Sequence, residues 1–324
     1  MINNYDLLVI TGPTASGKTA LAAAVADRID GEIISADSRQ VYREMNIGTG
    51  KDYNDYIVNG REIPVHLLDI VDPGYMFNVF EYQKSFLVSF QDIMKRNKFP
   101  VVCGGSGLYV DSIVSSYKLI EVPPDENFRK ELGEKTMKEL IDTLSTYKNL
   151  HNTTDVDTKK RAIRAIEIEH YYSKTKDSEI DFPPIRSLVT GVKYDRETRR
   201  KKISQRLKER LSNGMVEEVQ MLIDKGIPVE TLLYYGLEYK FITLYLTGKI
   251  SYDEMFCRLE VAIHQFAKRQ MTWFRGMERR GTKIHWLDGE MPMEEKVETI
   301  INLLNINGLT SNTYPATQNT PSAR

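Results

Sequence analysis

The sequence predicts an α/β protein in which a parallel sheet is flanked by helices and interrupted by a helical insertion. Short apolar segments alternate with helical patterns, which is typical of a parallel sheet covered on both faces. A glycine-rich loop joins the first apolar segment to the first helix, and strand patterns nearly vanish between residues 123 and 170. The chain has 324 residues, of which 41% are hydrophobic, so it can bury a sizeable core.

The first part of the chain supplies most of the predicted sheet. Its strands are short apolar runs bounded by turn residues, which is the pattern of buried strands. They are expected at residues 7–11, 32–35, 64–68 and 99–103. The helices between them have amphipathic or alanine-rich spacing. They are expected at residues 18–29, 80–95 and 108–116.

The rest of the chain divides into an insertion, the remainder of the core and a tail. A strand pattern returns at residues 187–194, and a possible edge strand lies at 283–287. Helices are expected at 199–225 with a break near Asn213 and Gly214, at 252–277 and at 294–304. The predicted parts are 1–122 (core, first part), 123–185 (helical insertion), 186–308 (remainder of the core) and 309–324 (disordered tail, rich in Thr, Ser, Asn and Pro).

Composition excludes several classes of protein. Cys103 and Cys257 are too few for a disulfide framework or a Cys-based zinc site, and no signal peptide or membrane span is indicated, so we expect a cytoplasmic protein. His66 and His264 have no partners at metal-ligand spacing. The net charge of −1 argues against an indiscriminate nucleic-acid binder. Residues 193–210 nevertheless form a basic stretch, either a binding surface or a solvated helix face.

A phosphate-binding loop is predicted directly after the first strand. Residues 12–19 read GPTASGKT, which matches G-x-x-x-x-G-K-[ST] between a strand and a helix and indicates a P-loop NTPase-like fold. Its N–H groups and the helix N-terminus would bind a di- or triphosphate, Lys18 would neutralise it, and Thr19 would offer a hydroxyl to Mg²⁺. The predicted diphosphate-binding residues here are Gly12, Pro13, Thr14, Ala15, Ser16, Gly17, Lys18 and Thr19.

The loop motif alone does not specify which reaction the bound phosphate takes part in. Most proteins with this loop transfer a terminal phosphoryl group of ATP or GTP, and an acidic residue at the end of a second strand assists the metal. The strand at 99–103 ends in Gly104 and Gly105 instead, although Asp37 follows the other early strand. The loop alone therefore leaves a kinase open as the function.

Several motifs lie in register with the phosphate loop. They are SADSRQVY (35–42), M-x-I-G-T-x-K (45–51), HLLD (66–69), GGSGLY (104–109) and QFAKRQMTWFR (265–275). Together they resemble the tRNA dimethylallyltransferase (isopentenyltransferase) family over residues 7–287. The resemblance implies transfer of a dimethylallyl group from dimethylallyl diphosphate to N6 of the adenine at tRNA position 37, next to the anticodon, by an Mg²⁺-dependent monomer.

The resemblance also assigns roles to individual residues. Asp37 would accept the proton of the adenine amine with Lys18 and Thr19 serving the diphosphate, although a turn carboxylate is the alternative for Asp37. Arg206 matches a family arginine and would bind diphosphate. The residues implied in binding the tRNA anticodon stem-loop are Asp37, Ser38, Arg39, Gln40, Ser106, Arg129, Lys160, Arg161 and Arg164.

The sequence departs from the family pattern at a few places. Lys202 stands at a family arginine, Glu238 and Phe241 replace a family glycine and glutamate, and the approach to the helix around Arg164 is shortened. The resemblance therefore specifies the chemistry more directly than the tRNA specificity, and a non-catalytic RNA-binding module that keeps the scaffold is an alternative. Trp273, Phe274 and Phe266 could stack on bases, but at helical spacing on an apolar face we expect them in the core.

Overall fold

The computed structural model describes residues 4–148, 156–175 and 182–304. The chain forms two compact units, one made of residues 1–116 with 184–324 and the other of residues 117–183. Each unit is described by itself. The tail expected at residues 309–324 lies outside the described residues.

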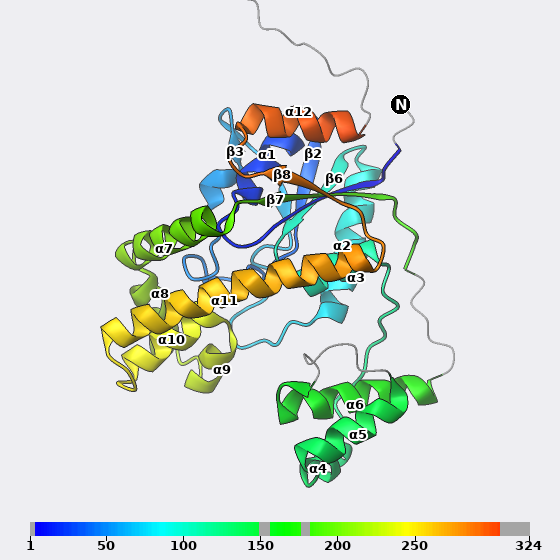
Figure 1. Cartoon of the computed structure of the whole chain (residues 1–324), viewed down its shortest axis with the longest axis vertical. Coiled ribbons are helices and arrows are strands. Elements are labelled where there is room, and N and C mark those ends of the chain that lie inside the picture. Colours follow the sequence, from blue (N-terminus) through cyan, green and yellow to red (C-terminus); the bar gives the residue numbers. More distant parts are fainter. Residues whose placement is uncertain (1–3, 149–155, 176–181, 305–324) are drawn as a thin grey trace, which may run out of the picture. The chain divides into compact units, whose positions relative to one another are not determined.

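The larger unit is built on a six-stranded sheet in which every paired strand is parallel (Figure 1). The strand order is β5 (Val65–His66), β2 (Gly31–Ser35), β6 (Phe99–Gly104), β1 (Leu7–Thr11), β7 (Ser187–Lys193) and β8 (Ile284–Asp288). All residues of β1 and β2 are buried, because helices cover both faces. The predicted fold class is confirmed, and β8 lies at the edge as expected.

The sheet register brings the ends of the central strands together. Thr11 pairs with Gly104 on one side and Gly191 on the other, and Ser35 pairs with Cys103. The carboxyl ends of β1, β2 and β6 therefore meet at one edge. A side chain at Gly104 would collide with the backbone of Ala36. This close approach explains why β6 ends in glycine where many phosphate-loop proteins carry an acid.

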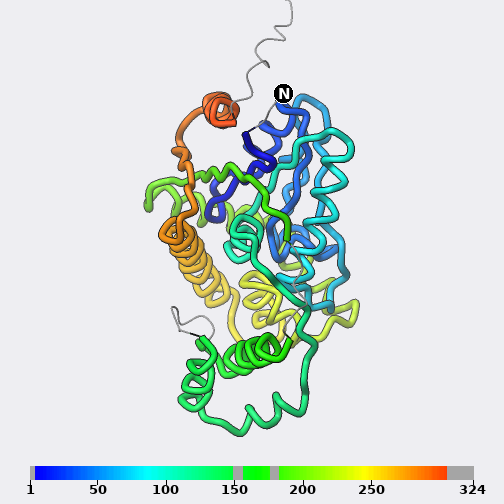
Figure 2. Tube along the Cα trace, turned by 90° about the vertical axis from the view of Figure 1, so that its right-hand side faces the viewer, coloured from blue at the N-terminus to red at the C-terminus, as the bar shows by residue number. Residues whose placement is uncertain are grey.

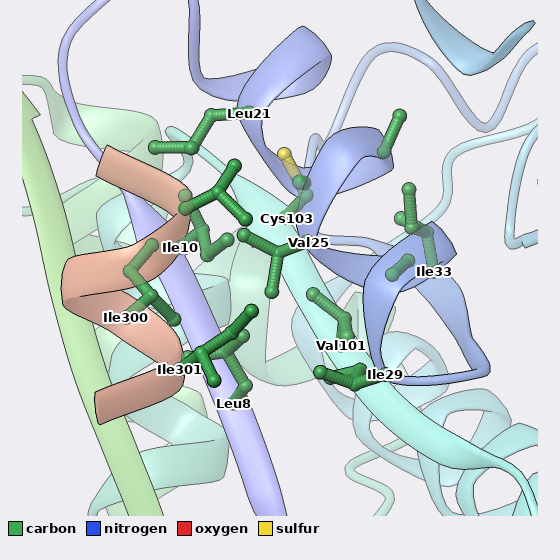
Figure 3. Packing of buried hydrophobic residues seen from close by; sticks show 14 of the residues in the cluster. Leu8, Ile10, Leu21, Val25, Ile29, Ile33, Val101, Cys103, Ile300 and Ile301 are labelled. Atoms are coloured by element: carbon green, nitrogen blue, oxygen red, sulfur yellow. The ribbon is translucent and has the colours of Figure 1, made fainter. Parts of the chain in front are cut away.

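Helices lie on both sides of the sheet (Figure 1). On one side are α1 (Lys18–Arg28) and α12 (Met293–Leu304), and on the other are α2 (Val79–Lys95), α3 (Gly107–Val114) and part of α11 (Tyr252–Arg279). The first side is packed by aliphatic residues of the strands and of both helices, as Figure 3 shows. They include Leu8, Ile10, Val25, Ile300 and Ile301.

A second cluster of helices continues the larger unit beyond the sheet. It contains α7 (Arg196–Ser212), α8 (Met215–Asp224), α9 (Val229–Tyr234), α10 (Leu237–Leu246) and the first half of α11, which Figure 2 traces as one continuous helix. Gly214 has a φ of 95° and separates α7 from α8, so the predicted break is confirmed. The sequence did not predict α9, α10, the turn η1 (Tyr53–Tyr56), or the hairpin of β3 (Ile57–Val58) and β4 (Arg61–Glu62).

The regular elements in the described part of the smaller unit are helices. They are α4 (Glu126–Gly133), α5 (Met137–Tyr147) and α6 (Lys159–Lys174). Asp125, Thr136 and Thr158 cap the three helices by accepting a backbone N–H bond. Leu140, Ile166 and their neighbours form a small separate core.

Candidate active site

The phosphate loop connects β1 to α1 through backbone conformations that only some residues adopt easily. Gly12 and Gly17 have φ values of 152° and 75°, and Ala15 has a φ of 60°. A Cβ atom at Gly12 would lie 2.5 Å from the carbonyl oxygen of Val192. The buried hydroxyl of Ser16 has no hydrogen-bond partner among the described residues. A buried polar atom without a partner indicates a place for a ligand.

Lys18 stands at the start of α1 without an ion pair among the described residues. Burial lowers the pKa of Lys18, while Cys103 and Asp37 act to raise it. Arg206 and Arg210 lower the pKa further. Their repulsion shows that the site gathers cations, which an anionic ligand would relieve.

A cavity of about 600 Å³ opens beside the loop. Its walls come from α1, from η1 with the residue before it, and from the face of α7 that carries Lys202 and Arg206. Arg206 donates to the Oδ2 atom of Asp52 at 2.6 Å. The structure thus places Arg206, which the sequence assigned to diphosphate binding, in the same cavity wall as the phosphate loop.

Two oxygen-bearing side chains in this cavity suit a divalent cation. Thr19 contributes a hydroxyl, and Asp55, which has no ion pair among the described residues, contributes a carboxylate. Burial and the neighbouring Asp52 raise the pKa of Asp55. Mg²⁺ in phosphate sites is commonly held by one or two such groups together with substrate phosphates and water. The donor set therefore fits Mg²⁺, and the acid comes from η1, not from a strand end.

Asp37 lies in a turn directly after β2, at the edge where the strands end. Its Oδ1 atom accepts a hydrogen bond from the N–H of Arg39 at 2.9 Å. The N–H of Ser38 donates to Oγ of Ser106 at 3.0 Å, and Nε2 of Gln40 donates to the carbonyl of Gly50 at 3.0 Å. The structure thus brings Asp37–Gln40 and Ser106 together. The bond from Arg39 also shows that the Asp37 carboxylate stabilises the turn, which was the alternative role given to it from the sequence.

Gln270 of α11 links the phosphate loop to the turn at Gly105 and Ser106, and sequence reasoning missed it. Its Oε1 atom accepts from the N–H of Thr14 at 2.9 Å, and its Nε2 atom donates to the carbonyl of Gly105 at 2.8 Å. A Cβ atom at Gly105 would lie 2.6 Å from that Nε2 atom. The only sequence signal was its place in the motif at 265–275. Gln270 fixes the phosphate loop relative to the turn that carries Ser106.

Glu218 of α8 is a second residue that the sequence did not single out. Its carboxylate accepts from the N–H groups of Asn46, Ile47 and Gly48 at 2.7–3.0 Å, and from the hydroxyl of Tyr239 at 2.7 Å. It anchors the loop that leads to Asp52 and Asp55.

Comparisons with known proteins agree with this geometry. The family model described as IPP transferase matches residues 40–277, and the model described as isopentenyl transferase matches residues 5–70. The chain belongs to the tRNA dimethylallyltransferase family.

Relatives and solved structures support this over nearly the whole chain. The "tRNA dimethylallyltransferase 2" of Phocaeicola vulgatus is 60% identical, covering 94% of this chain and 99% of that protein. The protein of the same name from Bacteroides fragilis is 61% identical and covers 92% and 97%. The tRNA isopentenylpyrophosphate transferase structure of Bacillus halodurans has a TM-score of 0.68 at 29% identity, covering 93% and 95%. The Staphylococcus epidermidis structure gives 0.66 at 31%, covering 92% and 98%.

The departures from the family pattern have identifiable surroundings. Lys202 lines the large cavity, with its Nζ 4.7 Å from the centre of the Tyr194 ring. Glu238 lies in the first turn of α10, where burial raises its pKa and Arg210 and Arg206 act to lower it. Phe241 packs against the helical cluster of the larger unit. Of the three, Lys202 and Glu238 face the phosphate-loop side of the site.

The three aromatic residues expected in the core differ in how deeply they are buried. Phe274 is fully buried as predicted. Trp273 is half-buried, packs against Gly107 and donates to Oδ2 of Asp111 at 3.1 Å. Phe266 is 39% exposed, so its core prediction was wrong: it points away from the buried stripe of α11, and its ring lies beside the guanidinium of Arg269.

In the smaller unit, the cations assigned to tRNA have partners of their own. Arg129 binds both carboxylate oxygens of Glu167 at 2.9 Å, and Arg164 also bonds Glu167. Arg161 pairs with Asp157 at 2.5 Å, and Lys160 is exposed. Burial acts to raise the pKa of Glu167, but hydrogen bonds from Arg129, the N–H of Asp125 and Arg164 outweigh it and lower the pKa.

His66 and His264, which lack partners at metal-ligand spacing along the sequence, each lie beside a polar side chain in the structure. Nε2 of His66 lies 2.7 Å from a carboxylate oxygen of Glu32, and Nε2 of His264 lies 3.4 Å from Oγ of Ser204. Within residues 4–148, 156–175 and 182–304, no group of three or more His, Cys, Asp or Glu could hold a metal ion. Among the described helices, none combines the length and apolar character needed to span a bilayer.

Proposed function

We propose that this protein transfers the dimethylallyl group of dimethylallyl diphosphate to N6 of the adenine at tRNA position 37 and releases diphosphate. The observation that carries the proposal is the meeting of the phosphate loop and the Asp37 turn at one sheet edge. Gln270 bonds the phosphate loop to the turn at Gly105, and the hydrogen bond from Ser38 to Ser106 joins that turn to Asp37. The curated relatives are named for this activity. Because its substrate would be tRNA, we place the protein in the cytoplasm.

The first part of the reaction is departure of the diphosphate. The allylic C–O bond breaks and its electron pair stays on the diphosphate oxygen, so negative charge grows there. The N–H groups of residues 15–19 and the ammonium of Lys18 would stabilise that charge, with Arg206 across the cavity. Mg²⁺, held by Thr19 and Asp55 together with diphosphate oxygens, would supply further positive charge.

The second part is attack by the adenine amine. Its lone pair is delocalised into the ring, so it needs a strong electrophile and a base. The new C–N bond forms at the allylic carbon, and Asp37 accepts the proton that N6 loses. The adenine must leave its stack to reach Asp37, which costs little in a loop that is already unpaired. Ser38, Arg39, Gln40 and Ser106 surround the turn and would contact the nucleotide.

The rest of the tRNA needs a wider surface. We assign the helical unit around residues 123–185 to the anticodon stem-loop, with Arg129, Lys160, Arg161 and Arg164 as the cations that face phosphates. The enzyme acts as a monomer in this proposal.

Two labels distinguish this function from a kinase. Carbon-labelled dimethylallyl diphosphate should pass its label to tRNA, whereas γ-labelled ATP should leave none in the product. Consumption of ATP without binding of dimethylallyl diphosphate would contradict the proposal. Mass spectrometry of tRNA from a deletion strain tests the second rival, because a non-catalytic RNA-binding module would leave N6-(dimethylallyl)adenosine in place.

A further inference from the structure

Arg210 is a largely buried cation whose hydrogen-bonding capacity is little used among the described residues. Its side chain is 14% exposed, and the ion pair found for it is a 3.4 Å contact with Oδ2 of Asp52. That same oxygen is bound at 2.6 Å by Arg206. A guanidinium has five N–H donors, and leaving such donors without acceptors in a buried place is costly.

The surroundings of Arg210 place it beside the phosphate loop. Arg206 and Arg210 are four residues apart on α7, so they share one helix face. Both line a small cavity whose other walls include Thr14 and Ala15 of the phosphate loop and Glu238 of α10. Arg206 also lines the large cavity. The two guanidinium groups therefore lie on the same side of the phosphate loop.

Charges around Arg210 are only partly balanced. Asp52 and Glu238 attract it, and Arg206 repels it. Its guanidinium also packs so closely on Gly50 that a side chain there would collide with it. Both arginines also repel the ammonium of Lys18 and lower its pKa. Three cations thus share this side of the loop, while Asp52 is divided between two of them.

We infer that Arg210 is a second guanidinium for the diphosphate of the prenyl donor. Asp52 holds Arg206 and Arg210 before the anion binds, and Glu238 keeps Arg210 turned toward the loop. When diphosphate binds, its oxygens replace Asp52 as the acceptor. Arg210 donates hydrogen bonds without losing a proton, as the C–O bond breaks and the electron pair stays on the diphosphate oxygen. This inference rests on the proposed function.

The direct test is equilibrium binding of inorganic diphosphate with Mg²⁺ to the full-length protein. Arg210→Met should weaken binding by about 10- to 100-fold, the usual worth of hydrogen bonds to a charged group. Arg210→Lys should recover part of the affinity because it restores the charge without the fork. Arg258→Met is the matched control, since Arg258 pairs with Glu254 on the exposed side of α11, and it should bind like the parent.

Two further measurements make the inference falsifiable. Asp52→Asn should strengthen diphosphate binding severalfold, because it removes a competing carboxylate, and weaker binding would overturn the role of Asp52. Arg210→Met should leave equilibrium tRNA binding unchanged, so weaker tRNA binding with intact diphosphate binding would assign Arg210 to an RNA phosphate instead. Parent-like diphosphate affinity in a variant with an unchanged melting temperature would overturn the inference. Failure of the proposed function differs, because the parent itself would then transfer no prenyl group.

Discussion

The sheet edge of the larger unit and the helical smaller unit use their polar side chains in opposite ways. At the sheet edge, Lys18 has no ion pair and the hydroxyl of Ser16 has no partner among the described residues. In the smaller unit, Arg129 and Arg164 are both bound to Glu167, which is 3% exposed. Unused donors thus mark the place kept for a ligand, whereas paired donors stabilise the fold.

This difference matters because the sequence assigned cations of both regions to ligands. A buried carboxylate such as Glu167 is tolerated only when paired and hydrogen-bonded, so its two arginines are needed by the protein itself. They can still face RNA, because their side chains are 32% and 39% exposed. Changing them should nevertheless affect folding first, which separates them from the residues of the sheet edge.

The largest effect is expected at Asp37. Asp37→Ala should reduce single-turnover prenyl transfer by a factor on the order of 10²–10⁴, the usual contribution of a general base. Asp37→Asn is the control for its turn role, because an amide oxygen can still accept the N–H of Arg39. Equal losses in both variants, with unchanged melting temperatures, would support the base. Full transfer by Asp37→Asn would instead leave Asp37 with the turn alone.

A somewhat smaller effect is expected at the phosphate loop. Lys18→Ala should slow transfer by roughly 10²–10³-fold, since the lost charge is most needed when the C–O bond breaks. Thr19→Ala should raise the Mg²⁺ concentration needed for half-maximal transfer, because a hydroxyl ligand is gone. Titration of Mg²⁺ against rate measures the second effect. An unchanged Mg²⁺ requirement would remove Thr19 from the metal site.

In the smaller unit the expected effect is on stability. Glu167→Gln should cost about 1–3 kcal/mol locally, because two guanidinium groups lose their carboxylate. Hydrogen exchange of α4 and α6 should report it, while prenyl-donor binding stays the same. Arg161→Gln is a suitable comparison, since its pair with Asp157 is exposed and worth little. Equal protection of α6 in the two variants would contradict the structural role of Glu167.

Acid should weaken the ion pairs that Glu167 makes with Arg129 and Arg164. The pKa of Glu167 is lowered in the folded protein, so its stabilisation is complete above the unfolded value of roughly 4.3 and is lost as pH falls through the folded value. Exchange protection of α6 should therefore fall in the acid range in the parent and much less in Glu167→Gln. Parallel acid profiles would show that other groups control this unit.

The smallest effect is expected for RNA binding by the exposed cations. Lys160→Gln or Arg161→Gln should reduce the slope of log affinity for tRNA against log salt by about one unit per lost phosphate contact. Arg129→Gln and Arg164→Gln should show the same slope change together with loss of helix protection. Dimethylallyl diphosphate affinity is the internal control and should not change. An unaltered slope would identify these cations as solvated or structural.

Local patterns were sufficient for most of the fold. The apolar runs at β1, β2 and β6 and the match at residues 12–19 predicted a parallel sheet with a phosphate loop, because strand burial and loop geometry depend on neighbouring residues. Short elements such as η1 and α9 were missed, since a few residues carry little periodicity and tertiary contacts hold them. Asp55, the acid that suits the metal, lies on η1 and could not be found for that reason.

The sequence by itself determined the fold class, the phosphate loop, and the residues at Asp37–Gln40 and Ser106 that line one edge. Only the tertiary structure decided which partner each charge has and what surrounds the pair. Arg129 and Arg206 read alike along the chain, but the first neutralises buried Glu167 and the second faces the cavity of the phosphate loop. The physical reason is that the pairing of a charge depends on groups far away in sequence, such as Asp52 for Arg206.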